Sequence, residues 1–173
     1  EMGELFDKLA NYGNSGIYPF HMPGHKRQKT VDFNPYKIDI TEIEGFDNLH
    51  HAEGVLLEAQ KKAEKLYGSE ESHFLINGST AGILSAVSAC AKKTVLIARN
   101  CHKAVYHAAL IRNLDVYYVY PEIQEEFMLN GGINPADVER SLEEHPEIEA
   151  VVITSPTYDG IVSDVKRIAE IAH

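Results

Sequence analysis

The 173 residues are enough for one domain with a sizeable core, and 44% hydrophobic with 24% charged residues is the balance of an ordinary globular protein. The formal net charge of −10 argues against nucleic acid or an anionic membrane as the main partner, because both require a basic surface. No apolar stretch approaches the ~20 residues that span a bilayer, no apolar signal sequence opens the chain, and two cysteines without a disulfide framework suit a reducing compartment, so we expect a cytoplasmic protein.

The first part of the chain, residues 1–68, has little strand pattern and is expected to be helical or irregular. Apolar residues at helical spacing and glycine end signals predict two helices, over residues 5–12 and 52–67. Glycine and proline residues break the sequence between them. We expect this segment to form entrance and dimer contacts rather than a sheet.

From residue 69 onward, short apolar runs alternate with helical segments. The runs of strand length are 73–76, 94–98, 116–120 and 150–154. The helical segments are 79–91, 102–113, 135–144, with Asn134 as cap and Pro135 in the first turn, and one that begins near residue 163. Strands that are apolar throughout are expected where helices cover both faces of a parallel sheet, so residues 69–173 are predicted to form part of an α/β layered domain.

The most informative local motif is Asn-Gly-Ser-Thr-Ala-Gly at 77–82, between the first predicted strand and the next helix. A helix N-terminus presents free N–H groups, Gly78 lets the backbone approach an anion, and Ser79 and Thr80 add hydroxyl donors. These features predict a phosphate cradle, although a plain capped helix start explains the same residues without a ligand. The motif is neither a Walker A loop nor a dinucleotide-binding glycine turn.

Polar residues also follow two later strands. His102 can stack on a flat heteroaromatic ring or exchange protons near neutral pH, and it can also simply cap the next helix. The last predicted strand is followed by hydroxyls from Ser155, Thr157 and Tyr158. Because ligands gather where parallel strands end, we expect these turns and the Gly78 turn to form one cleft, with solvated turns as the alternative.

The N-terminal segment is rich in histidine, with Phe-His-Met-Pro-Gly-His-Lys at 20–26 and Asp-Asn-Leu-His-His at 47–51. Their spacing fits no standard zinc pattern, so no metal site is predicted. Loop residues such as His25 and Lys26 are expected instead to meet an acidic substrate group or a partner subunit.

As a set, these segments resemble the Orn/Lys/Arg decarboxylases, enzymes that use pyridoxal 5′-phosphate (PLP) and have the aspartate-aminotransferase-like fold. The order and spacing of the motifs resemble that family from about residue 5 to the C terminus. The motifs are Pro-Gly-His-Lys at 23–26, Asp-Ile-Thr-Glu at 39–42 leading to Gly45 and Leu-His at 49–50, Asn-Gly-Ser-Thr at 77–80, Arg-Asn-Cys-His-Lys at 99–103 and Thr-Tyr-Asp-Gly at 157–160.

The resemblance implies a cofactor site. The cofactor-binding residues that it implies are Gly78, Ser79, Thr80, His102, Ser155 and Thr157. The first three would hold the phosphate of PLP, His102 would stack on the pyridine ring and act as a catalytic residue, and one of the last two would lie near the ring's 3-hydroxyl. No other cofactor and no metal is implied.

The resemblance also implies the fold and the assembly. The fold would be the three-layer α/β/α large domain of the PLP-dependent transferases, with a mostly parallel sheet that this chain leaves incomplete. Active sites in the family form between two subunits, so a homodimer or higher homo-oligomer is expected. His25 and Lys26 would lie near the active-site entrance or the dimer interface.

The family continues beyond the position that matches His173. Its next segment would carry an aspartate that pairs with the pyridine nitrogen and a lysine that forms the Schiff base with the cofactor, and the chemistry needs that lysine. We therefore expect the N-terminal portion of a decarboxylase of lysine, arginine or ornithine, which releases CO2 and a di- or polyamine. We expect this portion alone to be inactive and to have open sheet edges.

Two other functions stay open. One is another PLP enzyme of the same fold type, such as an aminotransferase or a lyase. The other is a non-catalytic anion- or nucleotide-binding α/β domain, which would bind a nucleotide and no PLP.

Overall fold

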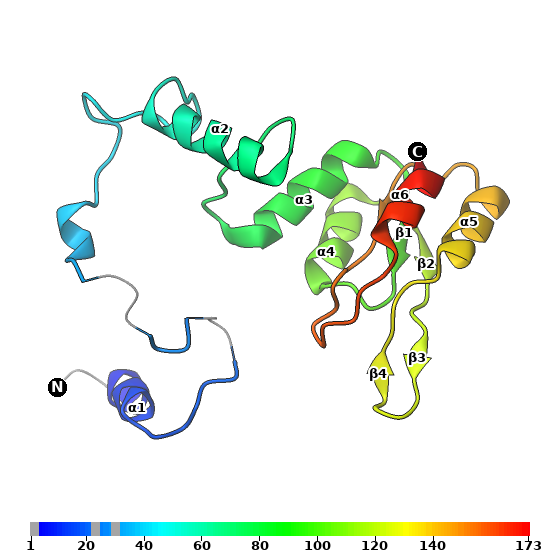
Figure 1. The fold of residues 1–173 in the computed structure, drawn as a ribbon, viewed down its shortest axis with the longest axis horizontal. Coiled ribbons are helices and arrows are strands. Elements are labelled where there is room, and N and C mark those ends of the chain that lie inside the picture. Colours follow the sequence, from blue (N-terminus) through cyan, green and yellow to red (C-terminus); the bar gives the residue numbers. More distant parts are fainter. Residues whose placement is uncertain (1–3, 22–24, 29–31) are drawn as a thin grey trace. The chain divides into compact units, whose positions relative to one another are not determined.

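The computed structural model describes residues 4–21, 25–28 and 32–173, which cluster into two compact units, Glu1–Tyr67 and Gly68–His173 (Figure 1). Pro23 and Gly24 of the expected entrance loop lie outside the described residues. No helix in the described ranges is both long and apolar enough to cross a membrane.

The first unit contains two α-helices and one short 3-10 helix. They are α1 (Glu4–Gly13), η1 (Pro35–Lys37) and α2 (Val55–Tyr67). The two predicted helices are thus confirmed, although α2 begins three residues later than expected. The later start has a local cause, because the N–H groups of Glu53 and Gly54, just before the helix, donate to the side chain of Asp47.

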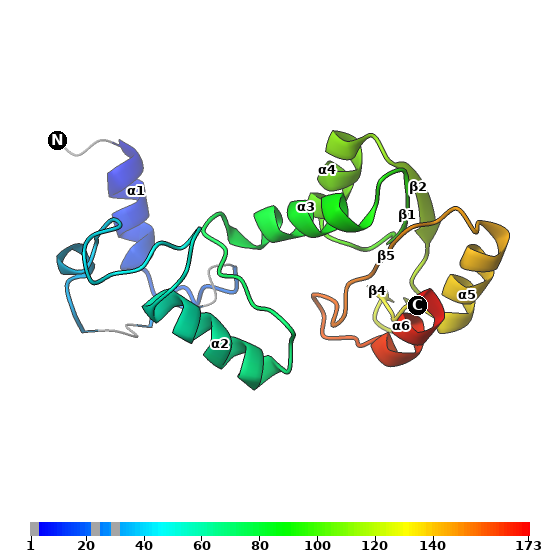
Figure 2. The same cartoon turned by 90° about the horizontal axis from the view of Figure 1, so that it is seen from above.

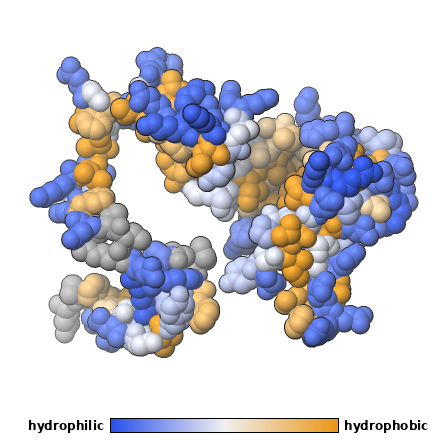
Figure 3. All heavy atoms as spheres, in the orientation of Figure 1, coloured by the Kyte–Doolittle hydropathy of each residue, from blue (hydrophilic) through white to orange (hydrophobic). Residues whose placement is uncertain are grey.

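Apolar side chains of the first unit are mostly exposed. Among its described residues only Pro19 and Gln60 are buried. Figure 3 shows orange, apolar spheres uncovered along the segment that leads to α2. The exposed apolar side chains of that segment include Ile38, Ile40, Ile43 and Phe46. The unit therefore has no hydrophobic core of its own in its described part.

The second unit contains four helices and five strands in its described residues. They are α3 (Gly78–Cys90), β1 (Thr94–Ala98), α4 (Lys103–Arg112), β2 (Asp115–Val119), β3 (Ile123–Gln124), β4 (Leu129–Asn130), α5 (Pro135–Glu144), β5 (Val151–Val152) and α6 (Val165–Ala172). β1 lies between β2 and β5 and is parallel to both. β3 and β4 form a separate antiparallel hairpin.

The core of this unit is built on β1, whose five residues are all buried. Val95 and Ile97 pack in one apolar cluster with residues of α3 and α4. Leu96 and Ala98 pack in a second cluster with residues of α5 and α6. Side chains of a strand alternate between its two faces, so helices cover both faces of the sheet, as Figure 2 shows. The predicted α/β class with a parallel sheet is confirmed.

This unit differs from the sequence prediction in two places. Residues 73–76 form no strand, and Phe74, Leu75 and Ile76 are exposed, because an apolar run becomes a strand only where a neighbouring strand takes its hydrogen bonds. The hairpin of β3 and β4 was not predicted, because strands of two residues are too short to show an alternation of apolar and polar side chains.

The sheet is open on both sides within the described residues. β5 is shorter than the predicted run 150–154 and pairs only with β1. β2 likewise pairs only with β1. Unpaired strand edges are places where another extended segment can add.

Candidate active site at the carboxyl end of the sheet

Parallel pairing places the carboxyl ends of β1 and β5 at one edge of the sheet. The turn from β1 into α4 and the loop after β5 both lie below the sheet in Figure 1. α3 enters β1 through a short connection at the opposite edge and packs against α4. Two of the predicted polar turns, those after β1 and β5, therefore lie at one edge of the sheet.

The start of α3 carries the predicted phosphate cradle. The preceding Asn77 makes no side-chain capping hydrogen bond within the described chain, so no capping side chain satisfies the first N–H groups of the helix. Gly78 has φ +71°, a conformation that favours glycine, and Ser79 and Thr80 are exposed. An uncapped helix start with two free hydroxyls suits an anion.

His102 caps the helix that follows it. Its Nδ1 accepts a hydrogen bond from the N–H of Ala104 at 3.1 Å, so the alternative that His102 caps α4 is confirmed. A neutral ring that accepts at Nδ1 carries its hydrogen on Nε2. Because the acceptor lone pair of Nδ1 lies in the plane of the ring, this bond does not occupy the faces of the ring. The side chain is exposed, so capping does not exclude stacking.

Two hydroxyl groups of the loop after β5 accept hydrogen bonds from the backbone of the same loop. Ser155 Oγ accepts from the N–H of Ser163 at 3.0 Å, and Thr157 Oγ1 accepts from the N–H of Ile161 at 3.1 Å. In both bonds the backbone supplies the hydrogen, so each hydroxyl keeps its own hydrogen for another acceptor. Thr157 is buried and Tyr158, at the tip of the loop, is 91% exposed.

Ser163 is a residue that the sequence reasoning missed. Its buried hydroxyl accepts from the N–H of Ile133 at 2.9 Å, while its own N–H reaches Ser155. It therefore joins the loop after β5 to the segment before α5. The partners are eight and 30 residues away in sequence, so no local pattern signals the link.

A cavity of about 500 Å³ runs along the outer side of β5. His102 and Thr154 line it, together with Ile83 of α3, and most of its other lining residues are apolar. Ser155 follows Thr154 directly, and Ser79 lies one helical turn before Ile83. The structure thus brings His102 and the end of β5 to one cavity, while residues 78–80, Ser155 and Thr157 are not among its lining.

Glu149 fixes the opposite, amino-terminal edge of the sheet. One carboxylate oxygen, Oε2, accepts from the N–H groups of Lys92, Lys93 and Thr94 at 2.7, 2.6 and 3.2 Å. These backbone hydrogen bonds, that of Lys93 first, lower the pKa of Glu149. The carboxylate ties the start of β5 to the start of β1 and so helps to align their far ends.

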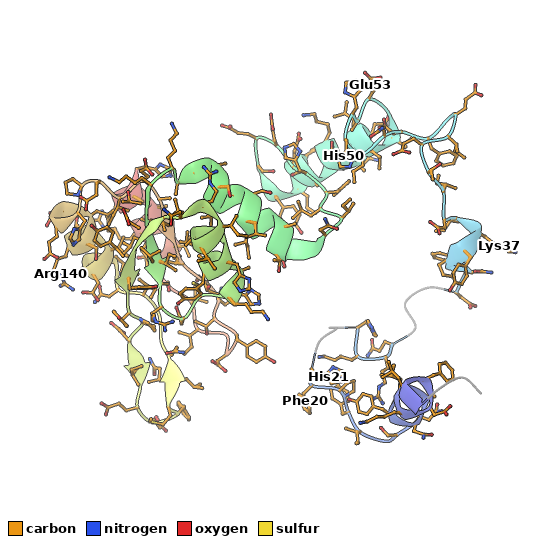
Figure 4. All side chains as sticks on the ribbon, turned by 180° about the vertical axis from the view of Figure 1, so that it is seen from behind. Phe20, His21, Lys37, His50, Glu53 and Arg140 are labelled. Atoms are coloured by element: carbon orange, nitrogen blue, oxygen red, sulfur yellow. The ribbon has the colours of Figure 1, made fainter. Side chains whose placement is uncertain are left out.

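The expected entrance residues belong to the first unit and make local contacts. Lys26 Nζ donates to the carbonyl oxygens of Phe20 and His21 at 3.3 and 2.9 Å. His25 Nδ1 accepts from the N–H of Arg27 at 3.0 Å. Figure 4 shows Phe20 and His21 beside α1. A role of His25 and Lys26 in substrate entry stays a prediction.

Asp47 organises the start of α2, a role that the histidine-rich segment did not signal. Its carboxylate accepts from the N–H groups of Glu53, Gly54 and Leu56 at 3.0, 2.7 and 3.1 Å. These bonds, that of Glu53 first, lower its pKa to about 2. In the part of the chain that the structure describes, no three His, Cys, Asp or Glu side chains gather as metal ligands would.

Comparisons with known proteins bear on the whole chain. The family model described as Orn/Lys/Arg decarboxylase, major domain, matches residues 4–173. An uncharacterized Bacillus subtilis protein, YaaO, is 36% identical over 179 residues, which cover 98% of this chain and 37% of that protein. An arginine decarboxylase of Bacillus cereus is 31% identical, over 98% of this chain and 39% of its own length.

A solved structure agrees with these matches. The constitutive lysine decarboxylase of E. coli superposes with a TM-score of 0.64 and 26% identity, over 96% of this chain and 27% of that chain. The chain spans less than two fifths of the length of the two curated relatives above.

Proposed function

The chain belongs to the Orn/Lys/Arg decarboxylase family, and on that premise we propose that it forms the first part of the PLP-binding large domain of a decarboxylase. The proposed substrates are lysine, arginine or ornithine, and the products are CO2 and a di- or polyamine. The observation that supports the proposal is the carboxyl edge shared by the parallel neighbours β1 and β5, where the turn with His102, which lines a cavity, and the hydroxyl-bearing loop after β5 begin. Relatives named arginine and lysine decarboxylase support the substrate class.

The residues at this edge fit the parts of PLP. The free N–H groups at the start of α3, with the hydroxyls of Ser79 and Thr80, would bind the phosphate. His102, held by its cap but open on its faces, would lie against the ring. Ser155 or Thr157 keeps a hydroxyl hydrogen that can be donated to an oxygen of the ring.

When bound, PLP supplies an electron-accepting ring for the electron pair that departing CO2 leaves behind. The chain's own residues bind and orient: the helix start holds the anion, and the imidazole limits how the ring can tilt. We propose that the lysine that carries the cofactor and the aspartate that keeps its nitrogen protonated come from another segment, so that these 173 residues alone do not turn over. The proposed location is the cytoplasm.

The direct test uses the intact protein with carboxyl-labelled lysine, arginine and ornithine. Release of labelled CO2 from one of them, with an absorbance band near the visible edge that borohydride bleaches, supports the proposal. Consumption of the amino acid without CO2 indicates an aminotransferase or another lyase. Binding of a nucleotide with no PLP band indicates a non-catalytic anion-binding domain.

The two possible roles of His102 can be separated by the choice of substitution. His102→Asn keeps a good helix cap but removes the aromatic ring, whereas His102→Ala removes both. If the ring stacks on the cofactor, both variants should lose turnover by about tenfold, the loss expected for one aromatic contact. Only His102→Ala should also lower the melting temperature clearly. Full activity in His102→Asn would contradict the stacking role.

The first unit is proposed to pack on a partner subunit. On α1, Leu5, Phe6 and Leu9 are 72%, 47% and 59% exposed, and the unit has no core in its described residues to cover them. A second copy of the protein would supply the missing apolar surface. Sedimentation equilibrium of the intact protein should therefore give at least twice the monomer mass, and a monomer at micromolar concentration would contradict the assembly.

A further inference from the structure

The turn between β1 and α4 is held by the hydroxyl of Tyr106, one helical turn after His102. This hydroxyl donates to the carbonyl oxygen of Arg99 at 2.8 Å and accepts from Arg99 Nη1 at 2.8 Å. Both the backbone and the side chain of Arg99 are thus joined to α4. Because one of the two bonds comes from a charged donor, it is stronger than a neutral hydrogen bond.

Two aromatic rings also flank the same arginine, Tyr106 from α4 and Tyr118 from β2. The guanidinium carbon of Arg99 lies 5.4 Å from the ring centre of Tyr106 and 5.7 Å from that of Tyr118. The two rings are stacked with centres 6.4 Å apart. The N–H of Arg99 donates to the carbonyl oxygen of Val119 at 2.8 Å. β1, β2 and α4 therefore meet at Arg99.

Only Asn100 and Cys101 separate Arg99 from His102. Cys101 is buried, which anchors the middle of the turn in the core. The side-chain oxygen of Asn100 is buried and has no hydrogen-bond partner in the described ranges, so it does not hold the turn. The turn is fixed at one end by the bonds of Tyr106 to Arg99 and at the other by the helix cap of His102.

We propose that Tyr106 is a positioning residue, which sets the orientation of the His102 ring at the cofactor by clasping Arg99 to α4. The claim that Tyr106 affects the cofactor rests on the proposed function. The claim that Tyr106 supports the His102 cap does not, because the structure shows that cap without any cofactor. The two parts can therefore be tested separately.

The test compares Tyr106→Phe with Tyr118→Phe in the intact protein. Each variant keeps its ring and loses one hydroxyl. The hydroxyl of Tyr118 makes no hydrogen bond to any described residue, so it is a matched control from the same aromatic stack. Arg99→Met is a third variant, which removes the guanidinium but leaves the carbonyl acceptor of residue 99 in place.

The first readout is amide hydrogen exchange at Ala104, whose N–H donates to His102, in protein stripped of PLP. Exchange should be about tenfold faster in Tyr106→Phe, because the loss of one hydrogen bond changes the equilibrium for local opening by about that factor. It should be unchanged in Tyr118→Phe and intermediate in Arg99→Met. The second readout is the visible circular dichroism of bound PLP, which reports how the ring is held and should shrink only in the first and third variants.

The outcomes distinguish this inference from the proposed function. Faster exchange at Ala104 together with a weakened dichroic band supports it. Equal exchange in Tyr106→Phe and in the wild type overturns it, and so does an unchanged dichroic band beside faster exchange. A wild-type protein that shows no PLP band overturns the proposed function, and with it the claim on the cofactor, while the exchange data still decide whether Tyr106 holds the cap.

Discussion

Replacement of Ser163 by alanine tests whether one buried hydroxyl holds the loop after β5 in place. The hydroxyl accepts from the N–H of Ile133, and the two residues are only 6% and 3% exposed. Alanine fills nearly the same space but offers no acceptor, and water cannot readily reach the stranded N–H. The N–H of residue 163 is unaffected and still donates to Ser155.

The expected size of the effect follows from that burial. A buried donor left without a partner costs roughly 1–3 kcal/mol. This corresponds to an increase of about fivefold to 150-fold in the equilibrium for local opening around Ile133. Because residue 163, which donates to Ser155, is no longer tied to Ile133, binding of PLP by the intact protein should also weaken, but less than in Ser155→Ala.

The assay is amide hydrogen exchange of Ile133 followed by NMR in the intact protein. Ser141→Ala is the matched control, since the Ser141 hydroxyl only donates to the carbonyl of Asp137 within α5 and its loss strands no donor. It should change stability by less than about 0.5 kcal/mol. Equal protection of Ile133 in Ser163→Ala and in the wild type would refute the reasoning, and so would an equally large effect in the control.

Two further predictions concern the phosphate cradle and the start of α2. Replacing Ser79 and Thr80 by alanine in the intact protein should weaken PLP binding by about tenfold or more for each hydroxyl, measured by titrating the cofactor absorbance, and unchanged affinity would reject the cradle. Asp47, whose pKa falls from an ordinary 3.8 to about 2, should stabilise the start of α2 fully above pH 4 and lose that effect as the pH falls toward 2. The backbone amide shifts of Glu53, Gly54 and Leu56, which donate to Asp47, should therefore lose in Asp47→Asn the change near pH 2 that the wild type shows. A start of α2 equally firm at pH 2 and pH 5 in the wild type would contradict this account.

Local signals predicted the elements that depend on neighbouring residues. The run at 94–98 is the observed strand β1, and the segment 135–144 is the observed helix α5, with Asn134 as its cap. Both follow from patterns that lie within a few positions of one another: continuous apolar character, and a capping residue before proline. The same kind of pattern placed His102 at a strand-to-helix turn, where the structure also has it.

The sequence by itself determined which residues follow the strands, and therefore which side chains stand at the carboxyl edge of the parallel sheet. Only the tertiary structure decided what holds them there. Ser163 meets Ile133, Glu149 meets the start of β1, and residues 73–76 lack a strand beside them. The physical reason is range: a helix or turn is stabilised by residues within a few positions, whereas these hydrogen bonds depend on which distant segments the fold brings together.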